Sequence, residues 1–362
     1  MEKEYGMKYL CAHRWAFNLW GGMLEQREDA LQPATGHEVT VRVTHCGMCH
    51  SDIHILAGGF DMGGGKLSSF ERAGVKLPVT MGHEIVGEVV EIGPDVTDVA
   101  LGAQVVVYPW LGCGDCAVCK TGDEHLCVKA ARNLGIQLPG GYADAVRVPH
   151  ERYLVPIGAL EPARAATFAC AGITALGAIR KVPTTTAEDW VAVIGCGGVG
   201  MTGVALLSAT SKAKIVAIDP DAAKRDAALA NGASLAFDPG MADAFKTINK
   251  ACGGNIAAAI DFVGSETSSS LAVSLVRRAG HVVIVGLFGG EFKMPLPMFA
   301  LKSITITGSY VGGLNDLREL VALAQRETLP SIPLDIRPLS TVNQALDDLT
   351  HGRVVGRVVL QP

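Results

Sequence analysis

The sequence has no excess of positive charge and no long hydrophobic run. Its 31 Lys and Arg residues are outnumbered by 36 Asp and Glu, which gives a formal net charge of −5. This balance argues against a nucleic-acid partner, because such partners usually require clustered basic residues. Gly, Asp or Lys interrupts each apolar stretch before it reaches the roughly 20 residues that span a membrane, so we expect no membrane partner. The charged start, residues 1–5, leads into no apolar segment, which predicts a cytoplasmic protein without a secretory signal.

Hydrophobic residues and cysteine are abundant instead. Hydrophobic residues occupy 49% of the 362 positions, which is ample material for the cores of two domains. The ten cysteines are expected to be reduced in a protein without an export signal, so metal binding explains them better than disulfides. A secreted disulfide framework is the alternative, and the length of the chain argues against it.

Four of the cysteines form a tight cluster, made of Cys113, Cys116, Cys119 and Cys127. Four thiolates at this spacing can occupy every corner of a tetrahedral zinc site, which predicts a closed, structural metal. A surface zinc knuckle that binds a partner is the alternative.

A second cluster has a different design. It reads Cys46-Gly-Met-Cys49-His-Ser-Asp-Ile-His54, and Gly-His-Glu84 follows further along the chain. One or two thiols beside Ser, Asp and His suit a zinc site with an open corner, where chemistry happens. A redox pair of Cys46 and Cys49 is the alternative, but it has no need of the surrounding polar residues.

The first third of the chain predicts short strands, at residues 37–44, 85–92 and 104–108, because these segments are rich in β-branched residues. Residues 58–76 are too rich in glycine for regular structure and are expected to form a loop near the cluster around Cys49. From residue 190 onward the pattern changes. Apolar strands at 190–194, 214–218, 257–261 and 281–285 alternate with helical segments at 199–208 and 222–231, which predicts a parallel sheet covered on both faces. A helix at 314–326 and a strand at 354–360 close the chain.

The strand at 190–194 leads directly into a glycine-rich turn that predicts a dinucleotide site. Its residues are Gly195, Gly197, Gly198, Val199 and Gly200. The glycines allow a tight turn, and the following helix directs its N-terminus at a pyrophosphate.

An acidic residue, Asp219, ends the next strand. It is expected to bind the ribose hydroxyls of NAD and to repel the 2′-phosphate of NADP. Two alternatives remain. Lys224 and Arg225 lie nearby in the sequence and would favour NADP, or the glycine-rich turn binds no ligand.

Several stretches together resemble one family over essentially the whole chain. They are Cys49-His-Ser-Asp-Ile-His54, Gly82-His-Glu84, the four-cysteine cluster, Cys170-Ala-Gly-Ile-Thr174, the turn at 195–200 and Gly286-Leu-Phe-Gly289. The sequence resembles the zinc-containing medium-chain alcohol dehydrogenases, most closely their tetrameric microbial and archaeal branch. The resemblance implies an α/β fold, with a β-rich GroES-like catalytic domain at 1–170 and 312–362. A Rossmann domain with a doubly wound parallel sheet would occupy 171–311.

The same resemblance implies reversible hydride transfer between an alcohol and NAD, two zinc ions per chain and a homotetramer. The catalytic zinc would be held by Cys49, His83 and Cys170, with Glu84 able to approach it. Asp52 would orient His83, and the four-cysteine cluster would hold the structural zinc.

The resemblance also implies roles around the substrate and cofactor. Ser51 would bind the alcohol oxygen, and a proton would pass through the nicotinamide ribose to His54 and then to water. The cofactor would contact His50, Thr174, Lys224 and Arg357. The substrate pocket would contain Ile53, Trp110, Leu287 and Phe288, which favours a medium-sized, mostly apolar alcohol. The alternatives are a zinc-dependent polyol dehydrogenase, a zinc-free quinone or enone reductase, and a non-catalytic protein that binds zinc and NAD.

Overall fold

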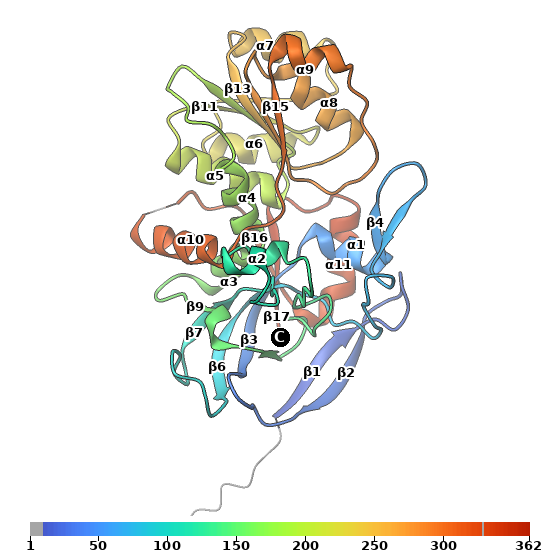
Figure 1. Ribbon diagram of the computed structural model, residues 1–362, viewed down its shortest axis with the longest axis vertical. Helices are drawn as coiled ribbons and strands as arrows, with labels where there is room; N and C mark the ends of the chain where they lie inside the picture. The colour runs from blue at the N-terminus through green and yellow to red at the C-terminus, as the bar shows by residue number, and fades with distance from the viewer. Residues whose placement is uncertain (1–9, 328) are drawn as a thin grey trace, which may run out of the picture.

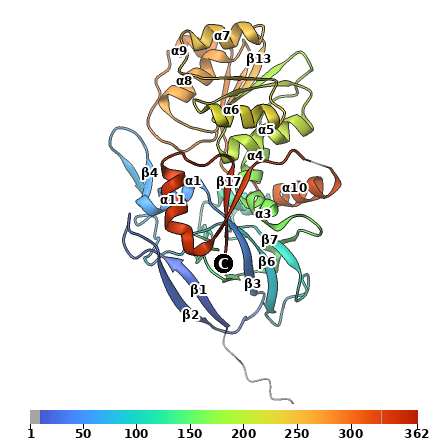
Figure 2. The ribbon, with the colours of Figure 1, turned by 180° about the vertical axis from the view of Figure 1, so that it is seen from behind.

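The structure is a computed structural model that describes residues 10–327 and 329–362. The expectation that residues 1–5 belong to no secretory signal therefore concerns residues outside the described ones. Figures 1 and 2 show two bodies stacked along the long axis: a β-rich body that contains β1, β3 and β17, and a second body in which helices flank a sheet. Helices α4 (Ala171–Ile179) and α5 (Gly198–Thr210) lie where the two bodies meet.

The β-rich body is built on a seven-stranded mixed sheet. The strand order is β16-β17-β3-β6-β7-β9, and β8 also pairs with β3. Strand β17, from the C-terminal end of the chain, pairs antiparallel with β3 through Val359 and Leu360. The sheet thus joins segments from both ends of the described chain. Its strands are β3 (Val39–Gly47), β6 (Glu84–Ile92), β7 (Gln104–Val107), β8 (Ala145–Val148), β9 (Leu154–Pro156), β16 (Leu334–Pro338) and β17 (Arg357–Gln361).

Two hairpins and five helices complete this part of the molecule, and a sixth helix, α4, lies between it and the second body. The hairpins are β1 (Leu10–Ala16) with β2 (Glu25–Leu31), and β4 (Gly59–Asp61) with β5 (Leu67–Ser69). The helices are α1 (His50–Ala57), α2 (Ala117–Lys120), α3 (Pro162–Ala166), α4 (Ala171–Ile179), α10 (Leu314–Arg326) and α11 (Val342–Thr350). Short 3-10 turns lie at Glu124–Leu126, Glu151–Tyr153, Thr167–Ala169 and Leu339–Thr341.

The second body contains a parallel sheet with the order β12-β11-β10-β13-β14-β15. Side chains of β10 alternate between two cores, Val191 and Val193 on one face and Ala192 and Ile194 on the other. Burial on both faces explains the continuous apolar strands of the sequence. The strands are β10 (Trp190–Ile194), β11 (Lys214–Ile218), β12 (Leu235–Phe237), β13 (Ile256–Asp261), β14 (His281–Ile284) and β15 (Thr305–Gly308). The helices are α5 (Gly198–Thr210), α6 (Ala222–Ala230), α7 (Ala244–Ala251), α8 (Glu266–Leu275) and α9 (Leu296–Lys302).

This sheet has its topological switch point beside β10. From β10 the chain goes to β11 and β12 on one side, and then crosses to β13 on the other side. Open α/β sheets bind ligands outside the carboxyl ends of the strands at such a point. Gly195 follows β10 directly and therefore stands at this position.

The expected fold class is confirmed, and several expected elements have the predicted bounds, including the strands at 190–194 and 214–218 and the helix at 314–326. The expectation of an irregular loop at 58–76 is wrong, because β4 and β5 pair within it. The closing strand begins at Arg357 and not at 354, since Gly356 has a positive φ of 84° and ends a turn there.

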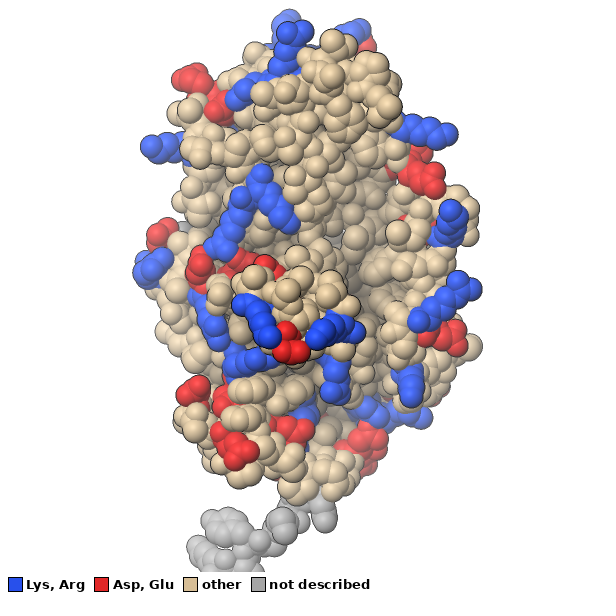
Figure 3. All heavy atoms as spheres, viewed as in Figure 1, with Lys and Arg blue, Asp and Glu red and all other residues tan. Residues whose placement is uncertain are grey.

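Among the described residues, no single helix is long and apolar enough to cross a membrane. A bent pair, 162–169 with 171–179, meets the requirements of length and composition together, with 55° between its parts. On the face shown in Figure 3, basic and acidic side chains are interspersed.

Candidate active site and metal centres

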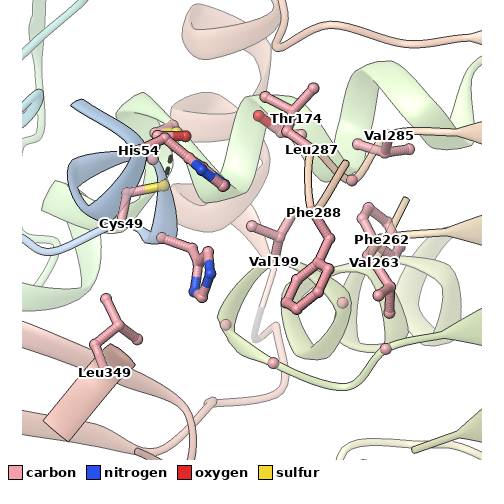
Figure 4. A pocket seen from close by; sticks show the side chains of 18 of the residues that line it. Cys49, His54, Thr174, Val199, Phe262, Val263, Val285, Leu287, Phe288 and Leu349 are labelled. Atoms are coloured by element: carbon pink, nitrogen blue, oxygen red, sulfur yellow. Dashed lines mark hydrogen bonds between the residues drawn. The ribbon is translucent and has the colours of Figure 1, made fainter. Parts of the chain in front are cut away.

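A cavity of about 310 Å³ receives residues from both bodies. The β-rich body contributes Cys49 and His54, and the parallel-sheet body contributes Val199 and Phe288, which Figure 4 shows on the opposite side of the cavity. The volume lies within the range of small-molecule and cofactor sites. The two sequence motifs that are separated by about 150 residues, the Cys49 cluster and the glycine turn, thus line one cavity.

Four potential metal ligands converge at the cavity: Cys49, His83, Glu84 and Cys170. Their ligand atoms all lie within 4.8 Å of one another, and all four residues are buried. The Cys49 and Cys170 Sγ atoms are 3.7 Å apart. Zinc–sulfur bonds of about 2.3 Å in a tetrahedron place two thiolates about 3.8 Å apart. Nε2 of His83 is buried without a hydrogen-bond partner among the described residues, as expected for an atom that binds a metal, while Nδ1 of the same ring faces Asp52. These residues therefore fit a zinc ion.

Local structure presents each ligand at the end of an element. Cys49 is the N-cap of α1 and Cys170 the N-cap of α4, while Glu84 begins β6. The turn before β6 requires glycine at position 82, which has a φ of 90°. A Cβ atom there would lie 2.6 Å from the Tyr142 ring, so a larger residue would displace the ligand that follows it.

A buried carboxylate, Asp52, supports this site from behind. Its Oδ2 accepts hydrogen bonds from the backbone N–H of Cys49 at 2.9 Å and from the hydroxyl of Tyr142 at 2.8 Å. Its Oδ1 lies 3.4 Å from His83 Nδ1. Carboxylates in this position commonly fix the ring orientation of a metal-bound histidine. Asp52 thus connects the backbone of one ligand to the side chain of another.

Glu84 forms an ion pair with Arg357, and both side chains are buried. Burial raises the pKa of Glu84 to about 7, although the Arg357 charge opposes this shift. Arg357 also packs beneath the glycine turn, since a Cβ atom at Gly198 would lie 2.2 Å from Arg357 Cδ. The arginine therefore links the metal ligands to the dinucleotide turn.

The four-cysteine cluster forms a separate centre. All four sulfur atoms lie within 4.8 Å of one another, and Cys113 Sγ is 3.8 Å from Cys119 Sγ. Backbone N–H groups donate to three of the sulfurs: Cys116 to Cys113 at 3.3 Å, Cys119 to Cys116 at 3.4 Å, and Cys113 to Cys127 at 3.4 Å. Such bonds stabilise thiolates, which are the form that binds metal. The cluster fits a closed zinc site.

The glycine turn leaves room for a pyrophosphate at the N-terminus of α5. Gly200 is required, because a Cβ atom there would lie 1.7 Å from the carbonyl oxygen of Gly195. Asp219 ends β11 at the same edge of the sheet and lines the cavity. Its Oδ2 accepts from Cys196 N–H at 2.7 Å and its Oδ1 from Asp221 N–H at 2.9 Å. Each oxygen retains a lone pair that can accept from a ribose hydroxyl.

Most of the residues expected at the substrate and cofactor line the cavity. They are His50, Ser51, His54, Trp110, Thr174, Gly195, Gly197, Gly198, Val199, Gly200, Asp219, Lys224, Leu287, Phe288 and Arg357. Ile53 is the exception, and its neighbour Ile55 lines the cavity instead. The helical period explains this difference, since positions 50, 51, 54 and 55 share one face of α1 and position 53 points elsewhere.

Sequence reasoning missed several aromatic residues of the cavity wall, namely Phe60, Phe70, Phe262 and Tyr310. Phe60 contacts His54, with ring centroids 5.2 Å apart, and Phe70 contacts Phe60 at 5.2 Å. Both lie on the β4–β5 hairpin or directly after it, in the segment expected to be an irregular loop. No pattern in the sequence distinguishes these aromatic residues from ordinary core residues.

Two histidines on α1 line the cavity, where His54 is half-buried and more of His50 is exposed. The rings of His50 and His54 meet edge to face, with centroids 5.5 Å apart. Burial lowers the pKa of each below the value of a free histidine. Both imidazoles are therefore neutral near physiological pH, a state in which a ring nitrogen can accept a proton.

A four-donor metal centre and a dinucleotide turn in one cavity define the chain as a metal-containing dehydrogenase. Comparisons with known proteins agree. Residues 35–159 match the alcohol dehydrogenase GroES-like domain, and residues 198–326 match the zinc-binding dehydrogenase domain. An NAD-dependent alcohol dehydrogenase of Sulfurisphaera tokodaii is 34% identical over 343 residues, which cover 94% of this chain and 97% of the relative.

Solved structures show the same relationship. The alcohol dehydrogenase of the archaeon Aeropyrum pernix superposes with a TM-score of 0.88 at 30% identity, covering 97% of this chain and 100% of that chain. The D-arabinose dehydrogenase of Sulfolobus solfataricus superposes with a TM-score of 0.82 at 28% identity, covering 98% and 100%. The chain belongs to the zinc-containing, NAD-dependent alcohol dehydrogenases of the archaeal and microbial branch. The expected family and enzyme class are confirmed.

Proposed function

We propose that this alcohol dehydrogenase holds two zinc ions per chain and acts on medium-sized, mostly apolar primary, secondary or cyclic alcohols, or on the matching aldehydes and ketones. The observation that most directly supports this proposal is the cavity, which is lined by Cys49, Cys170 and the glycine turn and has a largely apolar wall. Glu84 is proposed as a further residue that can approach the catalytic zinc.

Bound zinc supplies a Lewis acid that lowers the pKa of the substrate hydroxyl, and NAD supplies a hydride acceptor. The side chains of the protein position the reactants and move the proton. Cys49, His83 and Cys170 would hold the metal. Ser51 would accept the proton of the alcohol oxygen as it gives up its own hydroxyl proton, and His54, one turn along α1, would receive that proton and release it to water. The lowered pKa of His54 keeps this imidazole available as a base near neutral pH.

The cofactor is proposed to lie across the glycine turn, with its pyrophosphate at the N-terminus of α5 and its ribose hydroxyls on Asp219. Lys224 would lie near the same ribose, and His50 and Arg357 near the pyrophosphate. Thr174 would contact the nicotinamide, because its buried Oγ1 lines the cavity without a hydrogen-bond partner among the described residues.

Turnover of an alcohol panel tests the substrate class. The panel contains ethanol, hexanol, cyclohexanol and benzyl alcohol, with glycerol and sorbitol as polar counterparts, and NADH absorbance is the measurement. Each buried methylene contributes about 0.8 kcal/mol, so kcat/KM should rise about fourfold per methylene until the cavity is full. A higher kcat/KM for the polyols would instead favour a polyol dehydrogenase, the alternative that the similarity to a D-arabinose dehydrogenase supports.

The division into domains remains a proposal, with a catalytic domain at 1–170 and 312–362 and a Rossmann domain at 171–311. The membership of the two large sheets supports it, because β16 and β17 join the β-rich body. A cytoplasmic location is also proposed. The absence of disulfides among the cysteines whose side chains the structure describes supports a reducing compartment.

A homotetramer is proposed as the assembly. Strand β15 ends the parallel sheet and leaves one edge without a partner strand among the described residues. Beside it in sequence, α9 has no buried residue, and Leu296 and Leu301 are 79% and 70% exposed. Edge strands pair readily with a second copy, and exposed apolar side chains favour the same contact. Light scattering coupled to gel filtration tests this: four times the 37.8 kDa chain mass is expected, and a monomer or a dimer would refute it.

A further inference from the structure

Tyr310 lines the cavity close to the metal ligands, although the proposed mechanism gives it no role. Its ring meets Trp110 edge to face, with centroids 6.0 Å apart. Trp110 is itself fixed, because its Nε1 donates to the carbonyl oxygen of Ala169 at 3.1 Å and its ring packs on His83 at 5.2 Å. A row of three rings, His83, Trp110 and Tyr310, therefore sets the position of the phenol relative to the catalytic metal site.

The hydroxyl of Tyr310 forms no hydrogen bond with any part of the chain that the structure describes. Tyr310 is 40% exposed and lines the cavity, and burial raises the pKa of its phenol to about 12. The phenol stays protonated at neutral pH and offers an O–H donor.

Many of the residues that line the cavity with Tyr310 are apolar, although Ser51, His54 and Thr174 also line it. Ile136, Phe60, Phe70, Leu287 and Phe288 line the same cavity, and all are apolar. Polar groups that line a binding cavity without a protein partner commonly serve to orient a ligand. A donor without a protein partner selects for a ligand that has an acceptor at that point.

We propose that Tyr310 is a specificity-determining residue whose hydroxyl donates a hydrogen bond to a second oxygen of the substrate. The preferred substrates are then mostly apolar alcohols or carbonyl compounds that carry one further hydroxyl, carbonyl or ether oxygen near the reacting carbon. This inference rests on the proposed function, because it assumes that the alcohol oxygen binds between Cys49 and Cys170. The second oxygen takes no part in hydride or proton transfer.

The experiment compares two matched pairs of alcohols with the zinc-loaded, full-length enzyme and NAD. One pair is cyclohexanol with trans-cyclohexane-1,2-diol, and the other is 1-phenylethanol with 1-phenylethane-1,2-diol. The measured quantity is the ratio of kcat/KM for the diol to that for the plain alcohol. Tyr310→Phe keeps the ring and removes only the hydroxyl, so it should lower this ratio about 10-fold and change kcat/KM for the plain alcohols less than about twofold.

Two further variants separate the hydroxyl from the ring. Tyr310→Leu also removes the contact with Trp110 and should lower kcat/KM for both members of each pair. Ser309→Ala is the matched control, because Ser309 carries a buried hydroxyl without a hydrogen-bond partner among the described residues, but it does not line the cavity. The ratio should be unchanged in this control.

The inference is overturned if Tyr310→Phe leaves the ratio within about twofold of wild type in both pairs. It is also overturned if wild-type enzyme turns over the plain alcohol with the higher kcat/KM in both pairs, a result that requires no variant to fold. Turnover of the plain alcohols together with either result would leave the proposed function standing. Absence of NADH formation with all four alcohols would refute the proposed function and this inference with it.

Discussion

Replacing Tyr142 by Phe tests whether the support behind the catalytic metal ligands has the importance that its geometry implies. Tyr142 is fully buried, and its hydroxyl donates to Asp52 Oδ2 at 2.8 Å. The substitution removes this one bond and keeps the ring that packs against the turn at Gly82. Asp52 would keep its bond from Cys49 N–H and its contact with His83, so the loss is partial.

The magnitude follows from the charge of the acceptor. A hydrogen bond to a charged group contributes about 1.5–3 kcal/mol, so the free energy of unfolding should fall by about this amount. Changes behind a metal-bound histidine commonly lower metal affinity by about 10- to 100-fold. Because one of the two bonds to Oδ2 remains, we expect the lower end, about 10-fold faster loss of the catalytic zinc to a chelator.

Tyr108→Phe is the matched control. Tyr108 is equally buried, but its hydroxyl donates at 2.9 Å to the neutral carbonyl of Gly312. The control should lose only about 0.5–1.5 kcal/mol and should keep its zinc as wild type does. Denaturant unfolding gives the stability, and a chelating dye followed together with activity gives the rate of zinc loss. Equal rates of zinc loss in the two variants would refute the role given to Asp52.

Three further predictions concern the metals, the cofactor and the proton. Cys49→Ala should abolish turnover and leave about one zinc per chain. Cys116→Ser should mainly lower the free energy of unfolding, because a structural zinc site contributes folding free energy. Metal analysis that finds one zinc per chain in wild type would contradict both predictions. Asp219→Asn removes the charge that repels a 2′-phosphate and should raise the ratio of kcat/KM for NADP to that for NAD about 10-fold. A wild type that already prefers NADP would show that Asp219 does not discriminate. His54→Gln should slow alcohol oxidation about 10-fold or more near pH 6–7, where solvent base is scarce, and added buffer base should restore part of the rate. Because burial lowers the pKa of His54, the imidazole of the wild type should become protonated, and lose its faster rate over the variant, only below the pKa of a free histidine. An unchanged pH–rate profile in the variant would remove His54 from the proton path.

The sequence by itself determined the elements and motifs whose signal is local. The strand at Trp190–Ile194 was predictable because it is an apolar run bounded by a glycine turn, and α10 because its apolar residues follow the helical period. The four-cysteine cluster was predictable because its ligands lie close together in the chain. Its sulfur atoms do converge in the structure.

Only the tertiary structure decided which distant residues meet. Cys170 reaches Cys49 across 121 positions, and Tyr310 reaches Trp110 across 200, through packing that no short-range pattern encodes. Ile53 lies away from the cavity because of the way α1 is rotated about its axis. Strands β4 and β5 pair through backbone hydrogen bonds, which a glycine-rich sequence does not predict. Local composition fixes the period of an element, but the face that it turns towards a cavity is set by the elements that pack against it.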